Sequence, residues 1–185
     1  MIAVIFKRFG EVRASGAIGY GQRENMSIDH QGHMEGTVEF ATFFIDEDLY
    51  ALPAEHVLEA FPGSRVTVMS MGEREECIGV LALPEEVVWV FDLGYLIRGT
   101  PSVIDSSSQV LVARHGPHTI GLLVSELHGV PEFSLSEISP TPLASLSDGM
   151  LVPKVIKANG GRLLIQVVDV SCLFNMMKVG KETAT

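Results

Sequence analysis

Residues 76–93 read ECIGVLALPEEVVWVFDL, and this stretch decides the fold of the chain. Two apolar runs, Cys77–Leu83 and Val87–Leu93, flank a short break at Pro84-Glu85-Glu86. Short apolar runs that are bounded by turn residues are typical of strands. The stretch therefore predicts a strand, a turn and a second, buried strand, with Trp89 in the core.

Short β-rich segments continue on both sides of this pair, with turn residues between them. Asp46-Glu47-Asp48 and Asn159-Gly160-Gly161 are the clearest turns, because Asp, Asn and Gly accept the backbone angles of tight turns. The further predicted strands are Val38–Ile45, Leu49–Leu52, Val57–Phe61, Arg65–Met69, Val110–Ala113, Thr119–Val124, Gly129–Ser134, Leu151–Ala158 and Leu163–Val168.

The chain divides at a polar segment, Arg98–Gln109, which contains Gly99, Pro101 and three consecutive serines. About ten short strands with little helix, split in this way, predict an all-β fold. We expect two small SH3-like or OB-like β barrels packed together, the first at about residues 37–98 and the second at about 108–168. One open sheet fits this spacing less well.

One helix is predicted, at Val170–Lys178, where apolar residues recur on one face. Asp169 or Ser171 can cap its first turn, because their side-chain oxygens accept bonds from free backbone N–H groups. Gly180 ends the helix. Residues 179–185 are a short tail.

Residues 1–36 differ from the rest, since Gly, Ser, Gln, Asn and His are frequent there and hydrophobic periodicity is absent. We expect a flexible arm. It begins with an apolar segment, Met1–Phe6, which is followed by Lys7 and Arg8. That order is the reverse of a secretory signal. Whether Met1–Phe9 forms a strand stays open.

The chain is acidic, with a net charge of −10. Residues 1–34 hold four basic and three acidic side chains, whereas the remainder holds nine basic and twenty acidic ones. A body this acidic repels phosphate backbones and anionic lipid surfaces, so we expect no nucleic-acid partner and no direct membrane insertion. No apolar run approaches the roughly 18 residues of a membrane span.

Cys77 and Cys172 are the only cysteines, and each lies in an apolar stretch. Two widely separated cysteines in apolar surroundings are typical of buried thiols in a reducing cytoplasm. We therefore expect a cytoplasmic protein, and a single disulfide stays open.

The sequence contains no constellation that indicates catalysis or metal binding. His115 and His118 are close in sequence but lie on a predicted hairpin connector, and zinc requires three or four converging ligands. No G-x-S-x-G motif is present. The neighbouring carboxylates of Glu85 and Glu86 point apart on a turn and are poor acid–base partners. We expect no catalytic residue, no cofactor and no metal.

Several motifs together resemble the CheW-like domain. Val57-Leu58-Glu59 resembles a V-x-E signature, Ile78-Gly79-Val80 resembles x-G-V, and Val90-Phe91-Asp92-Leu93 resembles V-D-L. Thr119–Val124 and Leu163–Asp169 resemble the strand of the second half and the closing strand of the family. These motifs occur in the family's order, and the resemblance covers about residues 37–178.

The resemblance implies a non-enzymatic adaptor of bacterial chemotaxis. Its partners would be the cytoplasmic tip of a chemoreceptor, in the groove between the barrels, and the regulatory domain of a histidine kinase, on the first barrel. Val57 would supply apolar burial, Glu59 a charge that selects the partner, and Gly79 close backbone approach.

The central turn departs from the family's Asn-Leu-Arg-Gly, because Ala82, Leu83, Pro84 and Glu85 stand there. The loss of the basic residue suggests that Pro84 and Glu85 tune partner choice. Gly94 also stands where the family often has Arg.

Two other functions stay open. The chain could be a CheW-like regulatory fragment of a histidine kinase system, although it lacks glycine boxes for ATP and a phosphorylatable His on a helix. It could also be a ligand-binding sensor barrel, which a polar-lined cavity would favour.

Overall fold

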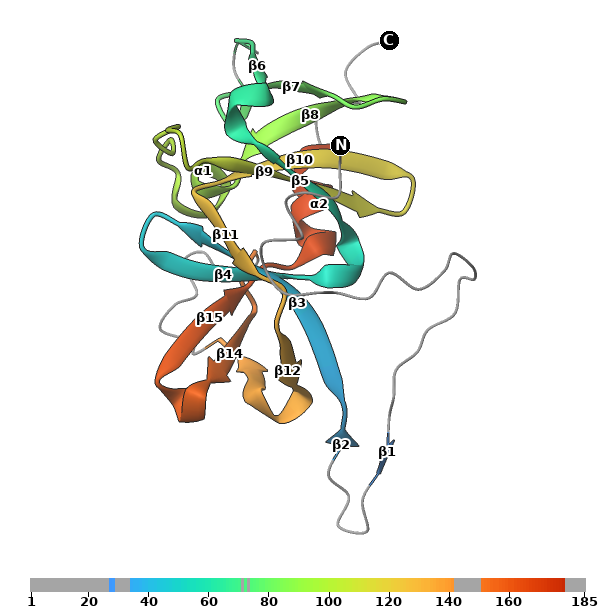
Figure 1. Ribbon diagram of the computed structural model, residues 1–185, viewed down its shortest axis with the longest axis vertical. Helices are drawn as coiled ribbons and strands as arrows, with labels where there is room; N and C mark the ends of the chain where they lie inside the picture. The colour runs from blue at the N-terminus through green and yellow to red at the C-terminus, as the bar shows by residue number, and fades with distance from the viewer. Residues whose placement is uncertain (1–26, 29–33, 71, 73, 142–150, 179–185) are drawn as a thin grey trace.

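The computed structural model describes residues 27–28, 34–70, 72, 74–141 and 151–178, which form two large sheets and two short α-helices (Figure 1). The predicted tail at 179–185, most of the predicted arm and the question of a strand at Met1–Phe9 lie outside the described residues. Within the arm, β1 (Ser27–Ile28) and β2 (Met34–Glu35) pair as antiparallel strands. This pair projects away from the two large sheets (Figure 1).

The first large sheet has six strands in the order β5-β9-β10-β8-β7-β6. Its strands are β5 (Val57–Pro62), β6 (Thr67–Val68), β7 (Cys77–Ala82), β8 (Val87–Asp92), β9 (Gln109–His115) and β10 (His118–Val124). All neighbours are antiparallel except β8 and β10, which are parallel. The strand–turn–strand prediction for residues 76–93 is confirmed by the β7–β8 pair.

The second large sheet has seven strands, six of them in the order β11-β3-β4-β15-β14-β13, while β12 also pairs with β3. Its strands are β3 (Thr37–Ile45), β4 (Asp48–Pro53), β11 (Glu126–Gly129), β12 (Glu132–Ser134), β13 (Ile138–Pro140), β14 (Lys154–Ala158) and β15 (Leu163–Val167). The predicted hairpins at the acidic turn and at Asn159-Gly160-Gly161 are confirmed as β3–β4 and β14–β15.

The chain is mostly β with two sheets, but the prediction of two barrels in sequence order does not match them. Strands β9 and β10, from the second half of the chain, lie in the same sheet as β5–β8. Strands β3 and β4, from the first half, lie in the same sheet as β11–β15. The cause is two parallel pairings between distant segments, β8 with β10 and β4 with β15. Among the described residues, neither sheet closes on itself.

The largest cluster of buried side chains is shared by strands of both sheets and by α2 (Val170–Lys178). Phe43, Leu52, Leu111, Leu122 and Phe174 belong to it, and each is at most 2% exposed. Burial of this apolar surface is the main stabilising contribution to such an arrangement. The predicted helix is confirmed, and so is its cap, since the Asp169 carboxylate accepts a bond of 2.7 Å from the Cys172 N–H.

Trp89 is not in the core, so that prediction is wrong. Val88 and Val90 of β8 are 2% and 0% exposed, whereas Val87 and Trp89 are 65% and 44% exposed. Side chains of a strand alternate between its two faces, and a fully apolar run does not reveal which face is covered. Leu93, the last residue of the predicted strand Val87–Leu93, instead begins a helix that the sequence did not predict, α1 (Leu93–Arg98).

Candidate functional site

A groove lies where the two sheets meet. It has a volume of about 130 Å³, and its lining residues come from β5, β9, β3, β11, the residue that follows β11, and the short 3₁₀ turn η2 (Ala54–His56). The lining residues are Ala41, Ala54, Val57, Ala60, Leu111, Leu127 and Val130. We call this hollow the seam groove. Its lining residues are all apolar, and three of them are small alanines.

Val57 reaches the seam groove because of the corner that precedes it. Pro53 ends β4 with φ −52°, and η2 then turns the chain into β5. The Val57 N–H donates to the Ala54 carbonyl and so closes the 3₁₀ turn. The predicted site residue Val57 therefore lies half-buried at the groove wall.

Glu59 does not share this surface with Val57. Val57 is paired with Ala113 of β9, whereas Glu59 is paired with Val112, because β5 contains a bulge between them. Directly paired residues of antiparallel strands point to the same face, and successive residues point to opposite faces. Val57 and Glu59 therefore lie on opposite faces of the six-stranded sheet, although only Leu58 separates them in the V-x-E motif.

Gly79 has a packing position in β7. Its φ is +154°, and a Cβ atom built on it would lie 2.2 Å from the Thr67 carbonyl oxygen of β6. Only glycine permits this approach. The expected close backbone approach at Gly79 thus occurs within the protein, between β6 and β7.

Pro84 and Glu85 lie at the exposed turn between β7 and β8, where the Leu83 N–H donates to the Glu86 carbonyl over 2.8 Å. Glu86 also lies 3.4 Å from the Arg114 guanidinium of β9. The backbone carbonyl of Arg114 is in turn 3.1 Å from Nδ1 of His56, the last residue of η2. This chain of contacts connects the central turn to the segment that positions Val57.

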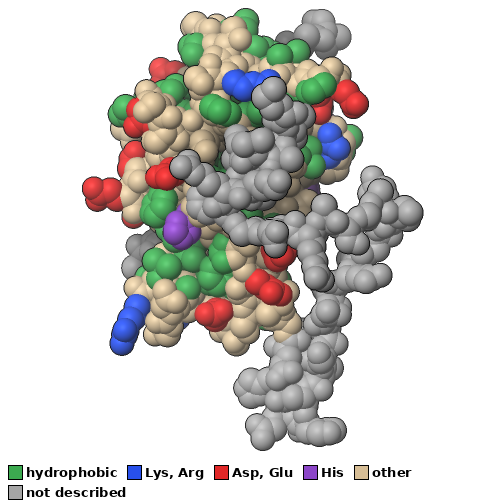
Figure 2. All heavy atoms as spheres, in the orientation of Figure 1, with side chains coloured by type: hydrophobic (Ala, Val, Ile, Leu, Met, Phe, Trp, Pro, Cys, Tyr) green, Lys and Arg blue, Asp and Glu red, His purple; other side chains and the backbone are tan. Residues whose placement is uncertain are grey.

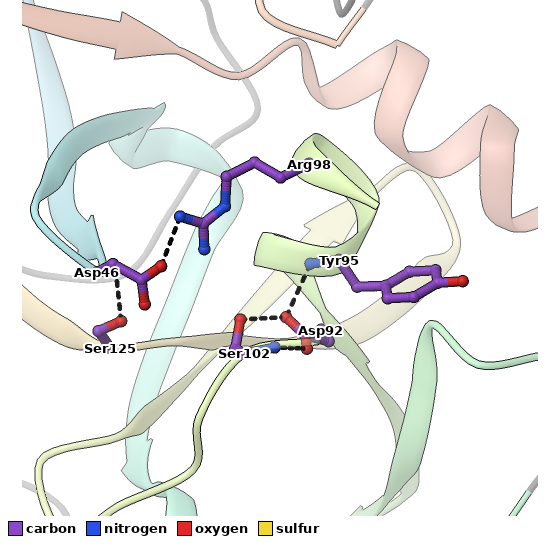
Figure 3. A network of polar contacts seen from close by, with 6 residues as sticks. All are labelled: Asp46, Asp92, Tyr95, Arg98, Ser102 and Ser125. Atoms are coloured by element: carbon purple, nitrogen blue, oxygen red, sulfur yellow. Dashed lines mark hydrogen bonds and ion pairs between the residues drawn. The ribbon is translucent and has the colours of Figure 1, made fainter. Parts of the chain in front are cut away.

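Asp92, the acid of the Asp-Leu pair, has a structural role (Figure 3). It is 2% exposed, and its carboxylate accepts bonds from the Tyr95 N–H at 3.0 Å, the Ser102 N–H at 2.7 Å and the Ser102 hydroxyl at 2.6 Å. The carboxylate caps α1 and fixes the connector that follows it. Gly94 is explained by the same packing, because its Cβ would lie 2.2 Å from Ser102 Oγ.

A second cluster of polar contacts fixes the acidic turn between β3 and β4 (Figure 3). Asp46 pairs with Arg98 of α1, and the Asp46 N–H donates to Ser125 Oγ over 2.9 Å. These contacts join the turn between β3 and β4 to the end of α1 and to Ser125, which follows β10. They hold the two sheets together at one end of the seam.

A set of exposed apolar side chains that the sequence pattern does not predict as a whole lies on β7, on β8 and directly after β6. Met69 and Trp89 are each 44% exposed, and Val80, which is paired with Trp89, is half-buried. Contiguous exposed apolar groups are typical of protein contact surfaces. We call Met69, Val80, Val87 and Trp89 the outer-strand surface. On the face in Figure 2, acidic side chains are spread over the described body beside exposed apolar ones.

The side chain of His115 packs beside two other rings. The His115 ring lies 5.3 Å from the ring of His56 and 5.5 Å from that of Phe174. Within the described ranges, no group of three His, Cys, Asp or Glu residues could hold a metal ion.

Cys77 and Cys172 are free thiols, but only Cys77 is buried; Cys172 is half-buried, contrary to prediction. Burial raises the pKa of the Cys77 thiol, and partial burial does the same for the pKa of Cys172.

No helix in the described part of the chain is long and apolar enough to cross a membrane.

Comparison with known proteins agrees with this architecture. A search of curated protein sequences finds no match. Among solved structures, the chain is similar to the scaffolding protein TtCheW from Thermoanaerobacter tengcongensis, with a TM-score of 0.64 and 21% sequence identity over 72% of this chain and 89% of that one. At this identity the likeness supports the fold. The family model of the CheW-like domain matches residues 39–178, and the chain therefore belongs to the CheW-like domain family.

Proposed function

We propose that this chain is a non-enzymatic scaffold of a bacterial chemotaxis complex that couples chemoreceptors to a histidine kinase. Its family and its likeness to a protein described as a scaffold support this role. The observation that carries the proposal is the seam groove, an apolar hollow at the junction of the two sheets. Such hollows take up apolar side chains of partner proteins.

The partner that we assign to the seam groove is the cytoplasmic tip of a chemoreceptor. Val57 offers a half-buried apolar wall, and Ala41 and Ala60 leave room for side chains of the partner. A receptor segment with apolar residues on one face gains binding energy by burying them there. Apolar contacts of this kind need no chemistry from the scaffold.

The partner that we assign to the six-stranded sheet is the regulatory domain of the kinase. Glu59 and the central turn, with Pro84 and Glu85, offer negative charge on this sheet, and charge at an interface acts mainly on specificity and association rate. Gly79 contributes indirectly, because it keeps β6 against β7. Both partners are cytoplasmic, and we place this protein there too.

The sensor alternative would require polar groups in the cavity, whereas the seam groove has an apolar lining. The kinase-fragment alternative would use the same two surfaces. Among the described residues, we see no feature that favours either alternative over the scaffold.

The test is binding to two purified fragments, the receptor tip and the kinase regulatory domain encoded beside this gene. Wild type should bind both. Val57→Asp should weaken binding of the receptor tip at least tenfold, because it places a charge in an apolar groove. Val103→Asp is the matched control, since Val103 is 79% exposed on the connector between α1 and β9.

Folded wild type that binds neither fragment would refute the scaffold function. If wild type and folded Val57→Asp bound the receptor tip equally well, the receptor would not bind in the seam groove. Circular dichroism and the melting temperature establish that each variant is folded.

A further inference from the structure

We propose that the apolar N-terminal segment of this same chain, Met1–Phe6, docks at the seam groove by adding as a strand to the free edge of β5. The segment lies outside the described residues; the groove, the edge strand, the charges and the length of the arm all favour its docking. Its docking does not depend on the function proposed above.

The edge of β5 is available for pairing. β5 is the terminal strand of the six-stranded sheet, and in the described part of the chain only β9 pairs with it. At its bulge it exposes Leu58, which is 46% accessible. An edge strand with unpaired backbone groups and an exposed apolar side chain is a template for an extended peptide.

The segment Met1–Phe6 suits such an edge. Its sequence, MIAVIF, has neither Gly nor Pro, and β-branched and aromatic residues dominate it. Ile2, Val4 and Phe6 fall on one face of an extended strand because side chains alternate. We assign this face to the groove, beside Val57 and Ala60 of β5, where the hollow of about 130 Å³ has room for large apolar side chains.

The charges around the groove complement those of the arm. No Lys or Arg occurs within two positions of any groove-lining residue, whereas four exposed glutamates do. These are Glu39, Glu55, Glu126 and Glu132. The apolar segment is followed directly by Lys7 and Arg8. An apolar strand that ends in two cations therefore suits an apolar groove whose lining residues have exposed glutamates as their near neighbours in the sequence.

The arm is long enough to return. Twenty residues, from Lys7 to Met26, join the segment to β1. Extended, they reach up to about 66 Å, at about 3.3 Å per residue. A compact domain of the size of residues 39–178 has a radius of gyration of about 14 Å. Because the connection is within one chain, it raises the effective concentration of the segment at the groove.

Docking of the arm would make it a competitor of the receptor tip, and this consequence rests on the proposed function. The arm would lower the apparent affinity of the groove for an apolar receptor segment by the fraction of time that it occupies the groove.

The docking itself is tested in the full chain by replacing Phe6 with the photo-crosslinker p-benzoylphenylalanine. Irradiation should give an intramolecular cross-link to residues 54–60 or 127–130, located by mass spectrometry of the digested protein. The same crosslinker in place of Tyr20 is the control and should not give this product. Cross-links elsewhere, or between two chains on a denaturing gel, would overturn the proposal.

A matched pair of variants tests the assigned face. Val4→Asp should abolish the cross-link from position 6 and increase hydrogen exchange of the β5 amides at 57–61. Ala3→Asp, on the opposite face, should leave both measurements near wild type. Equal effects of the two substitutions would contradict strand addition with this orientation.

The competition is measured separately with the receptor tip fragment. Val4→Asp should bind it more tightly than wild type, by about threefold or more, whereas Ala3→Asp should not. If the cross-link forms but the affinities are equal, the arm docks without competing, and autoinhibition is refuted. If all forms fail to bind the receptor tip, it is the proposed function that fails, and the cross-link still decides the docking.

Discussion

Gly121 of β10 packs directly against Val110 of β9: a Cβ atom built on Gly121 would lie 2.8 Å from Val110 Cγ1 and 3.0 Å from Val90 Cγ2 of β8. Both valines are fully buried. The glycine thus occupies the middle of the sheet where antiparallel and parallel neighbours meet, because no larger side chain fits between them.

Gly121→Val should destabilise the protein by overpacking this position, at a cost of about 1–3 kcal/mol. Urea unfolding followed by circular dichroism measures the change. Gly129→Val is the control, since its Cβ would meet nothing closer than Pro131 Cδ at 4.0 Å. Equal stability of Gly121→Val and wild type would place Gly121 in open space and contradict the structure.

Asp92→Ala should destabilise the end of β8 strongly. It removes the acceptor of three bonds at a position that is 2% exposed, and each buried donor left without an acceptor costs about 1–3 kcal/mol. Hydrogen exchange should also rise at the Tyr95 and Ser102 amides.

Asp105→Ala makes the matched control for Asp92. Asp105 also accepts bonds from backbone N–H groups, of Ser107 and Ser108, but it is exposed, so water replaces the lost acceptor. It should therefore cost less than Asp92→Ala. If Asp105→Ala destabilised the protein more than Asp92→Ala, the Asp92 carboxylate would not be what stabilises the start of α1 and the connector after it.

The fluorescence of Trp89 should be accessible to a quencher dissolved in the solvent while the protein is folded. It is the only tryptophan and is 44% exposed. We expect acrylamide to quench its fluorescence in the native state at a rate between those of a buried indole and a free one. A partner that covers the outer-strand surface should then reduce quenching. Native fluorescence that is fully protected from acrylamide would return Trp89 to the core.

The two thiols should react at very different rates. Cys172 is half-buried on α2, whereas Cys77 is buried in β7, and desolvation raises the pKa of both thiols. Since the thiolate is the reactive form, a disulfide reagent at pH 8 should modify Cys172 slowly and Cys77 only after unfolding. Cys172→Ser should abolish the slow reaction of the folded protein with the reagent. If that reaction persisted in the variant, Cys77 would be accessible in the folded state, in contradiction to its burial.

Val57 and Glu59 should affect different partners, because the β5 bulge places them on opposite faces. Glu59→Lys should reduce binding of the kinase fragment, mainly through the association rate, and leave receptor-tip binding unchanged. Val57→Asp should do the reverse. Surface plasmon resonance with both fragments measures the rates. Parallel losses for both partners in both folded variants would mean that the two residues share one surface.

The sequence by itself determined the local elements of this protein. The hairpins β3–β4, β7–β8 and β14–β15 and the helix α2 all follow from patterns within a few residues of each other. Turn residues such as Asn159 and Gly160 have positive φ angles that few other residues accept, and Asp169 caps α2 through a residue three positions away. Such interactions join residues that are close in sequence, so a local sequence pattern is enough to predict them.

Only the tertiary structure decided how these elements combine. The parallel pair of β8 and β10 joins Val90 to Gly121, and no local pattern encodes a contact across that distance. Trp89 and Val90 both belong to one apolar run, but only the surroundings of the sheet determine which of them is covered. The bulge that separates Val57 from Glu59 arises from their register with β9. Register and coverage depend on partners far away in sequence, and these form only when the two sheets pack.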